Sequence, residues 1–295
     1  MRKRERFRRL LRRGKHILSR WLCACLLAIP GFFMVMPVIL LLSGSIMSGQ
    51  ELADYFRPLW ENDGYIGWRF LAHYPVLEHY VRLLFFTPQF LTAFWNSFGL
   101  VTVILALQMA LSVPAAWAFA VYRFRFSKFL FTVYIVLMLM PFQVTMLSQY
   151  IILNDLHVMN THLALILPAA FSTFPVFLIY RGFRDIPREL LEAGRIDGAG
   201  EFGLFLRIGL PLSSGSILAA AVLGFLEYWN MIEQPLAFLQ DQSLWPLSLY
   251  LPADAKGQEG IAFAASVIIL IPAVFVFLLG RDYLEKGIVA SALKE

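Results

Sequence analysis

Apolar runs long enough to cross a lipid bilayer recur along this chain. A transmembrane helix needs roughly 20 predominantly apolar residues, and the chain is 59% hydrophobic. The runs lie at 21–42, 90–121, 129–153, 163–180, 212–239 and 260–280, and Pro141 interrupts the third. We therefore expect an all-α integral membrane protein with six transmembrane helices, the third of them broken at Pro141.

Positive charge is distributed unevenly between the two sides of these runs. Of the 25 Lys and Arg residues, only Arg57, Arg69, Arg82 and Lys256 fall on one side. Because cytoplasmic loops collect Lys and Arg, both termini are predicted to be cytoplasmic. The expected organisation is a basic cytoplasmic arm (1–20), a first transmembrane helix (21–42), an external loop (43–89), a five-helix core (90–282) and a cytoplasmic tail (283–295).

The Arg-rich arm has two further interpretations. A secretory signal is the alternative to an anchoring helix, but the basic region is long and no small-residue cleavage site follows it, which favours an uncleaved helix. Basic residues beside a membrane attract anionic lipid. The arm has no aromatic interleaving, so we expect membrane lipid and no nucleic acid as its partner.

A charged, helix-forming island occupies residues 185–211, between the fourth and fifth apolar runs. Pro187 suits the first helical position, and Asp197-Gly198 is a helix stop because glycine tolerates the left-handed conformation. A second short amphipathic piece follows at 202–208. The sequence predicts two short helices joined by a glycine turn, forming a water-exposed knob on which a soluble partner can act.

Polar residues in the fifth apolar run are candidates for lining a path through the membrane. Ionisable groups at membrane depth are costly and are functional hypotheses by default. Asn230 is expected to share a helix face with Glu227 and Gln234, and Tyr228 or Trp229 to stack on the ring of a solute. Hydrogen bonding between helices is the alternative use of Asn230. No Lys or Arg lies in the middle of any run, which favours a neutral solute.

Enzymatic and metal sites are not predicted. The chain contains no G-x-x-x-x-G-K-[ST] loop, so it is not expected to bind ATP in the Walker manner. His157 and His162 are five residues apart with no acidic or cysteine cluster beside them. The serines near Gly215 lack a nucleophile elbow and ordered partners. We expect no bound cofactor, no metal and no catalytic residues.

The island resembles the cytoplasmic signature of the permease subunits of binding-protein-dependent ABC importers. That signature reads Glu-Ala-Ala, three residues, Gly, nine residues, Ile, one residue, Leu-Pro. The matching residues are Glu192, Ala193, Gly194, Asp197, Gly198, Ala199, Ile208, Leu210 and Pro211. Gly194 departs from the second Ala of the signature and is expected to loosen the helix by about 1 kcal/mol.

The resemblance extends over about residues 75–295 and is similar to the carbohydrate-uptake, MalG-like type. It includes Pro141-Phe142-Gln143, Asn160-Thr161, Leu167-Pro168, Trp229-Asn230, Pro235-Leu236, Gly287 and Ala292-Leu293-Lys294.

The resemblance implies the type I ABC importer permease fold in a bacterial cytoplasmic membrane. It implies that the coupling loop (183–211) inserts a helix into a groove of a separate ATPase subunit, which uses the ATP. It also implies a second, homologous permease subunit and an extracytoplasmic solute-binding protein that delivers a sugar or oligosaccharide. The alternatives are the same class of transporter carrying glycerol phosphate, a polyamine or an amino acid, and a non-transport membrane scaffold.

Overall fold

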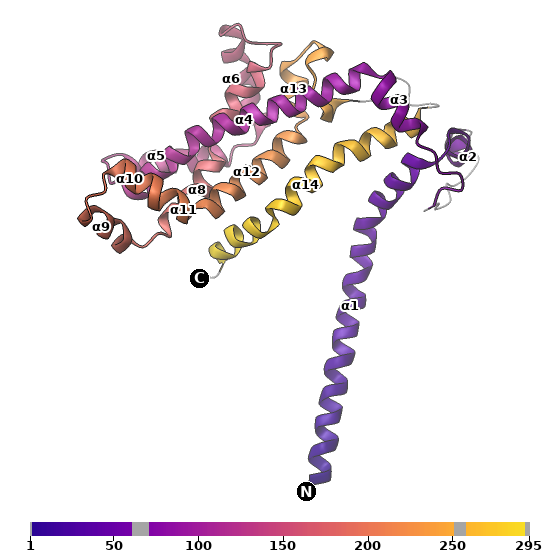
Figure 1. The fold of residues 1–295 in the computed structure, drawn as a ribbon, viewed down its shortest axis with the longest axis horizontal. Helices are drawn as coiled ribbons and strands as arrows, with labels where there is room; N and C mark the ends of the chain where they lie inside the picture. The colour runs from indigo at the N-terminus through magenta and orange to yellow at the C-terminus, as the bar shows by residue number, and fades with distance from the viewer. Residues whose placement is uncertain (1, 61–70, 251–257, 293–295) are drawn as a thin grey trace. The chain divides into compact units, whose positions relative to one another are not determined.

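The computed structural model describes residues 2–60, 71–250 and 258–292, with side chains described for 24–58, 71–250 and 258–285. Within these residues all regular secondary structure is helical (Figure 1). The chain divides into two units, residues 1–86 with 252–267, and residues 87–251 with 268–295. The described residues do not include Arg69 and Lys256, which were predicted to be external, or Leu293-Lys294 of the C-terminal resemblance. They also do not include the side chains of the basic arm.

Within its described residues 2–60 and 71–86, the first unit contains one long helix followed by two short ones, and it also includes the start of the last helix. Helix α1 (Arg2–Ile46) runs without a break through the predicted boundary at residue 21, and its apolar part, Ala24–Ile46, is long enough to span a membrane. Helices α2 (Gly49–Trp60) and α3 (Glu78–Phe86) lie in the segment expected to be an external loop. That segment is therefore partly helical.

A carboxylate on α2 fixes the chain that leads to α3. Glu51 Oε1 accepts a hydrogen bond from the His73 backbone N–H at 3.0 Å, and Oε2 accepts one from the Tyr74 N–H at 3.4 Å. Burial raises the pKa of the Glu51 carboxyl, but these backbone hydrogen bonds and His73 outweigh it, so that its pKa lies below the usual value. The ionised carboxylate thus holds the two segments together at neutral pH.

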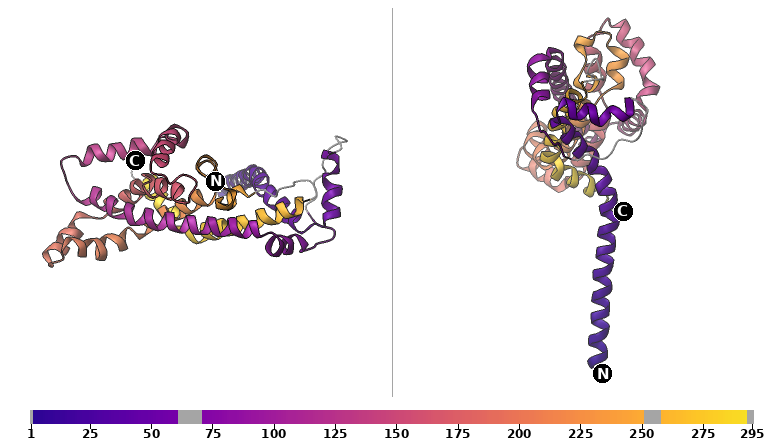
Figure 2. Two further views of the ribbon diagram at one scale, coloured as in Figure 1. Left: turned by 90° about the horizontal axis from the view of Figure 1, so that it is seen from above. Right: turned by 90° about the vertical axis from the view of Figure 1, so that its right-hand side faces the viewer.

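The second unit is built around α4 (Pro88–Val121), which packs against α7 (Leu163–Ala170), α8 (Phe174–Arg184) and α12 (Ser214–Trp229), as Figures 1 and 2 show. Small residues allow close approach: a Cβ on Gly182 of α8 would lie 1.7 Å from Ser216 Oγ of α12. The shared core contains Val113, Ala116, Trp117, Val176, Ile179, Phe183, Ile186, Leu191, Leu204 and Ala220.

Two of the apolar segments are sharply bent. Helices α5 (Ser127–Met138) and α6 (Phe142–Asp155) meet at 104°, and Pro141 lies immediately before α6, which confirms the predicted break. The helical stretch 201–212 meets α12 at 69°. Four described helices are long and apolar enough to cross a membrane, and the number rises to six if each bent pair counts as one span.

The fifth span is shorter than expected. The predicted run of 212–239 is wrong at its end, because α12 stops at Trp229 and a separate helix, α13 (Glu233–Phe238), follows. The Asn230 side chain donates a hydrogen bond to the Leu226 carbonyl at 2.8 Å, a local bond that competes with helix continuation. Pro235 has no N–H with which to extend the helix across this break. The last helix, α14, spans Glu259–Ala292.

The Asn160-Thr161 motif anchors the segment after α13. Asn160 adopts a positive φ of 56°, and its Oδ1 accepts hydrogen bonds from the backbone N–H groups of Gln240 at 2.9 Å and Asp241 at 2.8 Å. The ring of His162 lies in hydrogen-bond contact with the Leu244 carbonyl at 3.1 Å. This part of the resemblance therefore has a structural explanation.

The core of the second unit supplies the first prediction. Trp117 is 4% exposed and its ring lies 5.1 Å from that of Phe183 and 5.6 Å from that of Phe205. Trp117→Ala should lower the free energy of unfolding by about 3 to 5 kcal/mol, because it leaves a large cavity. The measurement is thermal unfolding of the purified protein in detergent.

The matched control is Trp95→Ala on the same helix, where the side chain is 64% exposed. It should change the unfolding midpoint far less than Trp117→Ala does. Equal shifts for the two variants would contradict the assignment of Trp117 to the core.

Candidate functional site

The island folds into two short helices joined by a glycine turn. We name residues 185–212 the knob. Helix α9 (Arg188–Ile196) has Asp197 as its C-cap, and Gly198 has the left-handed φ of 83° that the sequence predicts. The Ala199 N–H donates to the Gly194 carbonyl and the Gly198 N–H to the Arg195 carbonyl, each at 3.0 Å. This pair of bonds is the Schellman motif, which satisfies the last carbonyls of the helix.

The return limb of the knob contains a widened helical turn. Helix α10 (Glu201–Leu204) continues into η1 (Phe205–Gly209) and α11 (Leu210–Leu212). The Leu210 N–H bonds to the carbonyl of Phe205, five residues earlier. Pro211 explains this widening, because a proline ring clashes with the carbonyl four residues before it and has no N–H to donate.

Gly194 brings the two limbs into close contact. A Cβ at Gly194 would lie 2.7 Å from Leu204 Cδ2 and 3.0 Å from Ile208 Cδ1. The structure gives Gly194 a packing role, and the expected loosening of α9 stays a prediction. Leu191 and Leu204 are buried in the core shared with α4, α8 and α12. The knob is therefore continuous with the membrane helices.

An ion pair and a hydrogen bond join the knob to the end of α4. Arg195 Nε lies 3.0 Å from Glu201 Oε1, and the Tyr122 hydroxyl donates to Glu201 Oε2 at 3.0 Å. The hydrogen bond from Arg195 lowers the pKa of the Glu201 carboxyl. Its contribution persists at neutral pH and is lost as the pH falls through the lowered value. Tyr122 and Glu201 were not predicted as partners, because they lie 79 residues apart along the chain.

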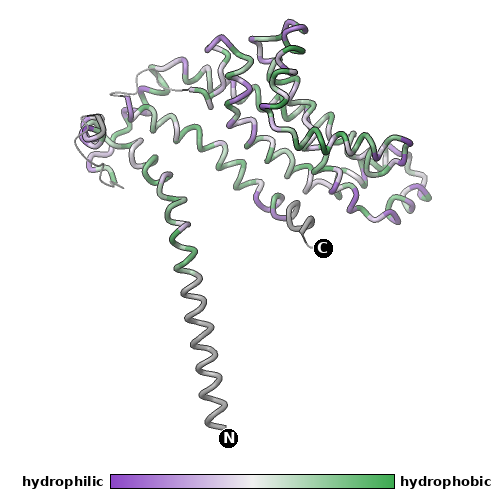
Figure 3. Tube along the Cα trace, turned by 180° about the vertical axis from the view of Figure 1, so that it is seen from behind, coloured by the Kyte–Doolittle hydropathy of each residue, from purple (hydrophilic) through white to green (hydrophobic). Residues whose placement is uncertain are grey.

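Several apolar side chains of the knob are exposed on its surface. The exposed fraction of the side chain is 46% at Leu190, 86% at Ile196 and 72% at Phe202. Figure 3 shows hydrophilic residues around this end of the second unit. Of the signature residues, Glu192, Ala193, Asp197, Gly198 and Pro211 are exposed, whereas Gly194, Ala199, Ile208 and Leu210 are partly buried. The knob thus combines a buried inner face with an exposed outer face.

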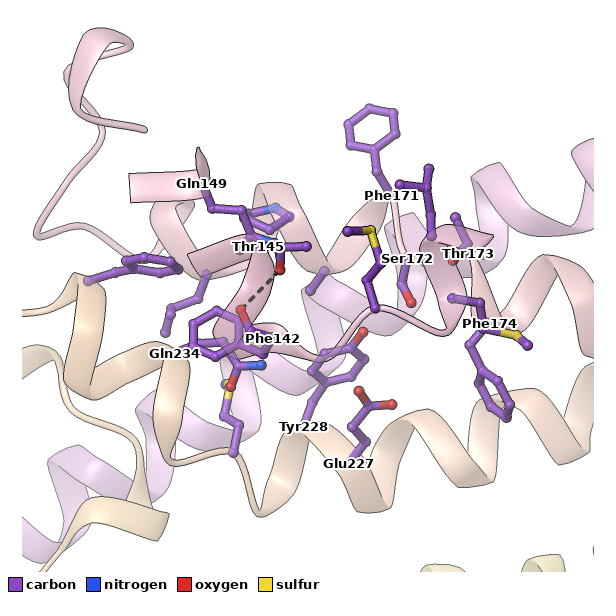
Figure 4. A pocket seen from close by; sticks show the side chains of 18 of the residues that line it. Phe142, Thr145, Gln149, Phe171, Ser172, Thr173, Phe174, Glu227, Tyr228 and Gln234 are labelled. Carbon is purple, nitrogen blue, oxygen red and sulfur yellow. Dashed lines mark hydrogen bonds between the residues drawn. The ribbon is translucent and has the colours of Figure 1, made fainter. Parts of the chain in front are cut away.

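A cavity of about 360 Å³ lies beside the far end of α12 (Figure 4). Its volume falls within the range of small-molecule sites. Residues from α5, α6, α7, the start of α8, α12 and α13 line it, together with the break between α7 and α8. The polar side chains are Thr145, Gln149, Ser172, Thr173, Glu227, Tyr228 and Gln234, and the aromatic side chains are Phe142, Phe171, Phe174, Tyr228 and Phe238.

The predicted path residues separate into two groups. Glu227, Tyr228 and Gln234 line the cavity, and Asn230 is not among the lining residues. The expectation that Asn230 and Gln234 share one helix face is wrong, because α12 ends at Trp229 and Gln234 belongs to the separate helix α13. Contact of these side chains with a solute stays a prediction.

Two aromatic neighbours on α12 have different surroundings. Tyr228 is 6% exposed, and its hydroxyl accepts a hydrogen bond from Gln108 Nε2 at 2.9 Å. The same Gln108 amide donates to the Ala169 carbonyl at 3.0 Å, so α4 fixes the Tyr228 ring at the cavity. Trp229 is 1% exposed and donates from Nε1 to the Ile269 carbonyl at 3.0 Å. Stacking of Trp229 on a sugar is therefore wrong for this structure, since the ring is part of the core.

The helical fold, the bent spans and the knob define a polytopic membrane permease component. The chain belongs to the family of binding-protein-dependent transport system inner membrane components, whose sequence profile matches residues 108–290.

Relatives and a solved structure agree with this assignment. The chain is 31% identical over 221 residues to the arabinooligosaccharides transport system permease protein AraQ of Halalkalibacterium halodurans, covering 74% of this chain and 79% of that protein. It is 31% identical over 202 residues to the sn-glycerol-3-phosphate transport system permease protein UgpE of Brucella abortus, covering 67% and 72%. The fold matches a chain of a bacterial ABC transporter involved in the import of the acidic polysaccharide alginate, with a TM-score of 0.75 and 21% identity over 89% of this chain and 95% of that one.

The glycine turn of the knob gives the second prediction. Gly198→Ala should destabilise the Schellman motif by about 1 to 2 kcal/mol, because an L residue is strained at positive φ. No atom lies within 4 Å of the position of an added Cβ, so the backbone strain acts alone. Amide hydrogen exchange across residues 193–199 should become about tenfold faster.

Gly200→Ala is the matched control, since Gly200 has a φ of −69° and equally open space around its Cβ position. Exchange in this control should remain at the wild-type rate. Faster exchange in both variants, or in neither, would contradict the role of the left-handed turn.

Proposed function

We propose that this chain is the membrane-spanning permease subunit of an ATP-driven importer for a sugar or oligosaccharide. A solute-binding protein delivers the solute from outside, and the ATP is used by a separate ATPase subunit. The family and the similarity to AraQ support the transport class and its carbohydrate substrate. A second, homologous permease completes the pathway, because one subunit of this size encloses little volume.

The single observation that carries this proposal is the construction of the knob. Ile196 and Phe202 are exposed on the surface of the knob, whereas Leu191 and Leu204 lie in the core of the membrane helices. An ATPase groove that accepts α9 would bury the exposed apolar side chains, which is the usual mode of helix-in-groove recognition. The knob is assigned to the cytoplasm, together with both termini, because Lys and Arg concentrate on its side of the membrane.

Movement of the ATPase reaches the cavity through packed helices. The return limb of the knob leads through Pro211 directly into α12, and α12 carries Glu227 and Tyr228 at its other end. Displacement of α9 therefore shifts α12 relative to α4 and α8. We infer that this shift opens the path alternately to the two sides of the membrane.

The chemistry of the cavity favours a neutral solute. Amide and hydroxyl groups of Thr145, Gln149, Ser172 and Gln234 suit sugar hydroxyls, and Tyr228 offers an apolar ring beside them. Glu227 is the charged residue among those lining the cavity, and none of the described lining residues is Lys, Arg or His. A carboxylate in such a site repels anions.

Glycerol phosphate is the second candidate solute, since UgpE is as similar in identity as AraQ. A phosphorylated solute would gain from a cationic path. Glu227 argues against it.

The knob gives the third prediction. Ile196→Ser should weaken binding of the ATPase subunit about 30-fold, because it removes the apolar surface of one side chain that docking would bury. Binding is measured with purified ATPase, and uptake of a panel of labelled sugars is measured in cells that carry the variant.

Ile152→Ser on α6, where the side chain is also exposed at 58%, is the matched control and should retain wild-type binding. Undiminished ATPase binding by Ile196→Ser would remove the knob from the docking surface. Isolation of the complex without any ATPase would favour the scaffold alternative.

The charge of the cavity gives the fourth prediction. Glu227→Gln should leave neutral sugar uptake within a fewfold of wild type and increase inhibition of that uptake by anionic solutes such as glycerol phosphate. The measurement is the inhibition constant of each solute in uptake assays. Glu233→Gln is the control, since Glu233 accepts hydrogen bonds from Gln143 Nε2 at 2.7 to 2.8 Å and does not line the cavity. Unchanged inhibition constants for anionic solutes in Glu227→Gln would contradict the proposal that the Glu227 carboxylate repels anions.

A further inference from the structure

A second cavity, of about 820 Å³, lies where α4, α5, α8 and α9 meet. It belongs entirely to the second unit, at the end of the helices that carries the knob. Most of its charged lining residues are cationic. Five are cationic, Arg123, Lys128, Arg184, Arg188 and Arg195, and one, Glu192, is acidic.

The cations of this cavity differ in how far they are neutralised. Arg195 is paired with Glu201, and Arg184 Nη1 donates to the Tyr180 hydroxyl at 3.1 Å. No carboxylate in the described part of the chain pairs with Arg123 or Lys128. The cavity therefore retains unneutralised positive charge, which suits an anionic group such as a phosphate.

Aromatic and apolar side chains continue the cavity along α5. Phe119, Phe131 and Tyr180 line its wall, with the rings of Phe131 and Tyr180 only 4.2 Å apart. None of the residues of α5 is buried, and Phe129 and Val136 are 66% and 54% exposed. A ligand that fits both parts carries a phosphate at one end and alkyl chains at the other.

We propose that this cavity binds the headgroup of an anionic phospholipid. Its phosphate lies among Arg123, Lys128 and Arg184, and its acyl chains follow the apolar side of α5. Basic pockets between transmembrane helices are suited to such headgroups. Free inorganic phosphate is also an anion, but it makes no use of the apolar wall.

The bound lipid also contacts the knob. Leu191, Glu192 and Arg195 of α9 line the same cavity as Arg123 and Lys128. The composition of the surrounding membrane therefore acts on the position of α9. Binding itself does not depend on the proposed transport activity, so failure of the transport proposal leaves this inference open to its own test.

The test is native mass spectrometry of the delipidated full complex, titrated in neutral detergent with phosphatidylglycerol, phosphatidylcholine or inorganic phosphate. The variant is Arg123→Gln combined with Lys128→Gln. Each cation near a membrane surface contributes about fivefold to binding of anionic lipid, so the double variant should bind phosphatidylglycerol about 25-fold more weakly. Wild type should bind phosphatidylcholine poorly, and millimolar phosphate should not displace the lipid.

Arg125→Gln is the matched control. Arg125 lies on the same connection between α4 and α5, but it is over the Phe126 ring at 5.8 Å and does not line the cavity. It should bind phosphatidylglycerol as wild type does. Equal loss in this control, unchanged binding in the double variant, equal affinity for phosphatidylcholine, or displacement by phosphate would each overturn the proposal. Equal thermal unfolding midpoints for the three proteins exclude misfolding as the cause of a loss.

Discussion

The buried core that Leu191 and Leu204 share with Trp117 and Phe183 is the feature on which the rest of the structure depends. These side chains belong to one buried core that includes residues of α4, α8, α9, α10 and α12. The knob and the membrane helices share buried apolar surface, so the knob cannot move without displacing the helices.

The polypeptide chain and its polar contacts also connect the knob to the membrane helices. The Schellman turn at Gly198 fixes the angle between the two limbs of the knob, and the Arg195–Glu201–Tyr122 contacts tie that turn to the end of α4. The return limb then enters α12 through Pro211. Because α12 carries Glu227 and Tyr228 at its far end, it connects the end of the knob with the proposed solute cavity.

Local sequence signals predicted the local features of this architecture well. Pro141 predicted the break before α6, and Asp197-Gly198 predicted the turn of the knob. The apolar runs predicted the long helices. Features that depend on contacts between distant segments were not predictable in this way. The Gln108–Tyr228 hydrogen bond joins residues 120 apart. Burial of Trp229 depends on α14, and the packing role of Gly194 depends on Leu204 and Ile208 across the turn.

Photo-cross-linking from position 196 tests the central claim most directly. A photoreactive amino acid replaces Ile196 in cells that express the complete transporter, and the adduct is identified by mass spectrometry. Our account predicts a cross-link to a cytoplasmic nucleotide-hydrolysing subunit. A cross-link to a protein outside the cell, or to lipid alone in the assembled complex, would contradict it.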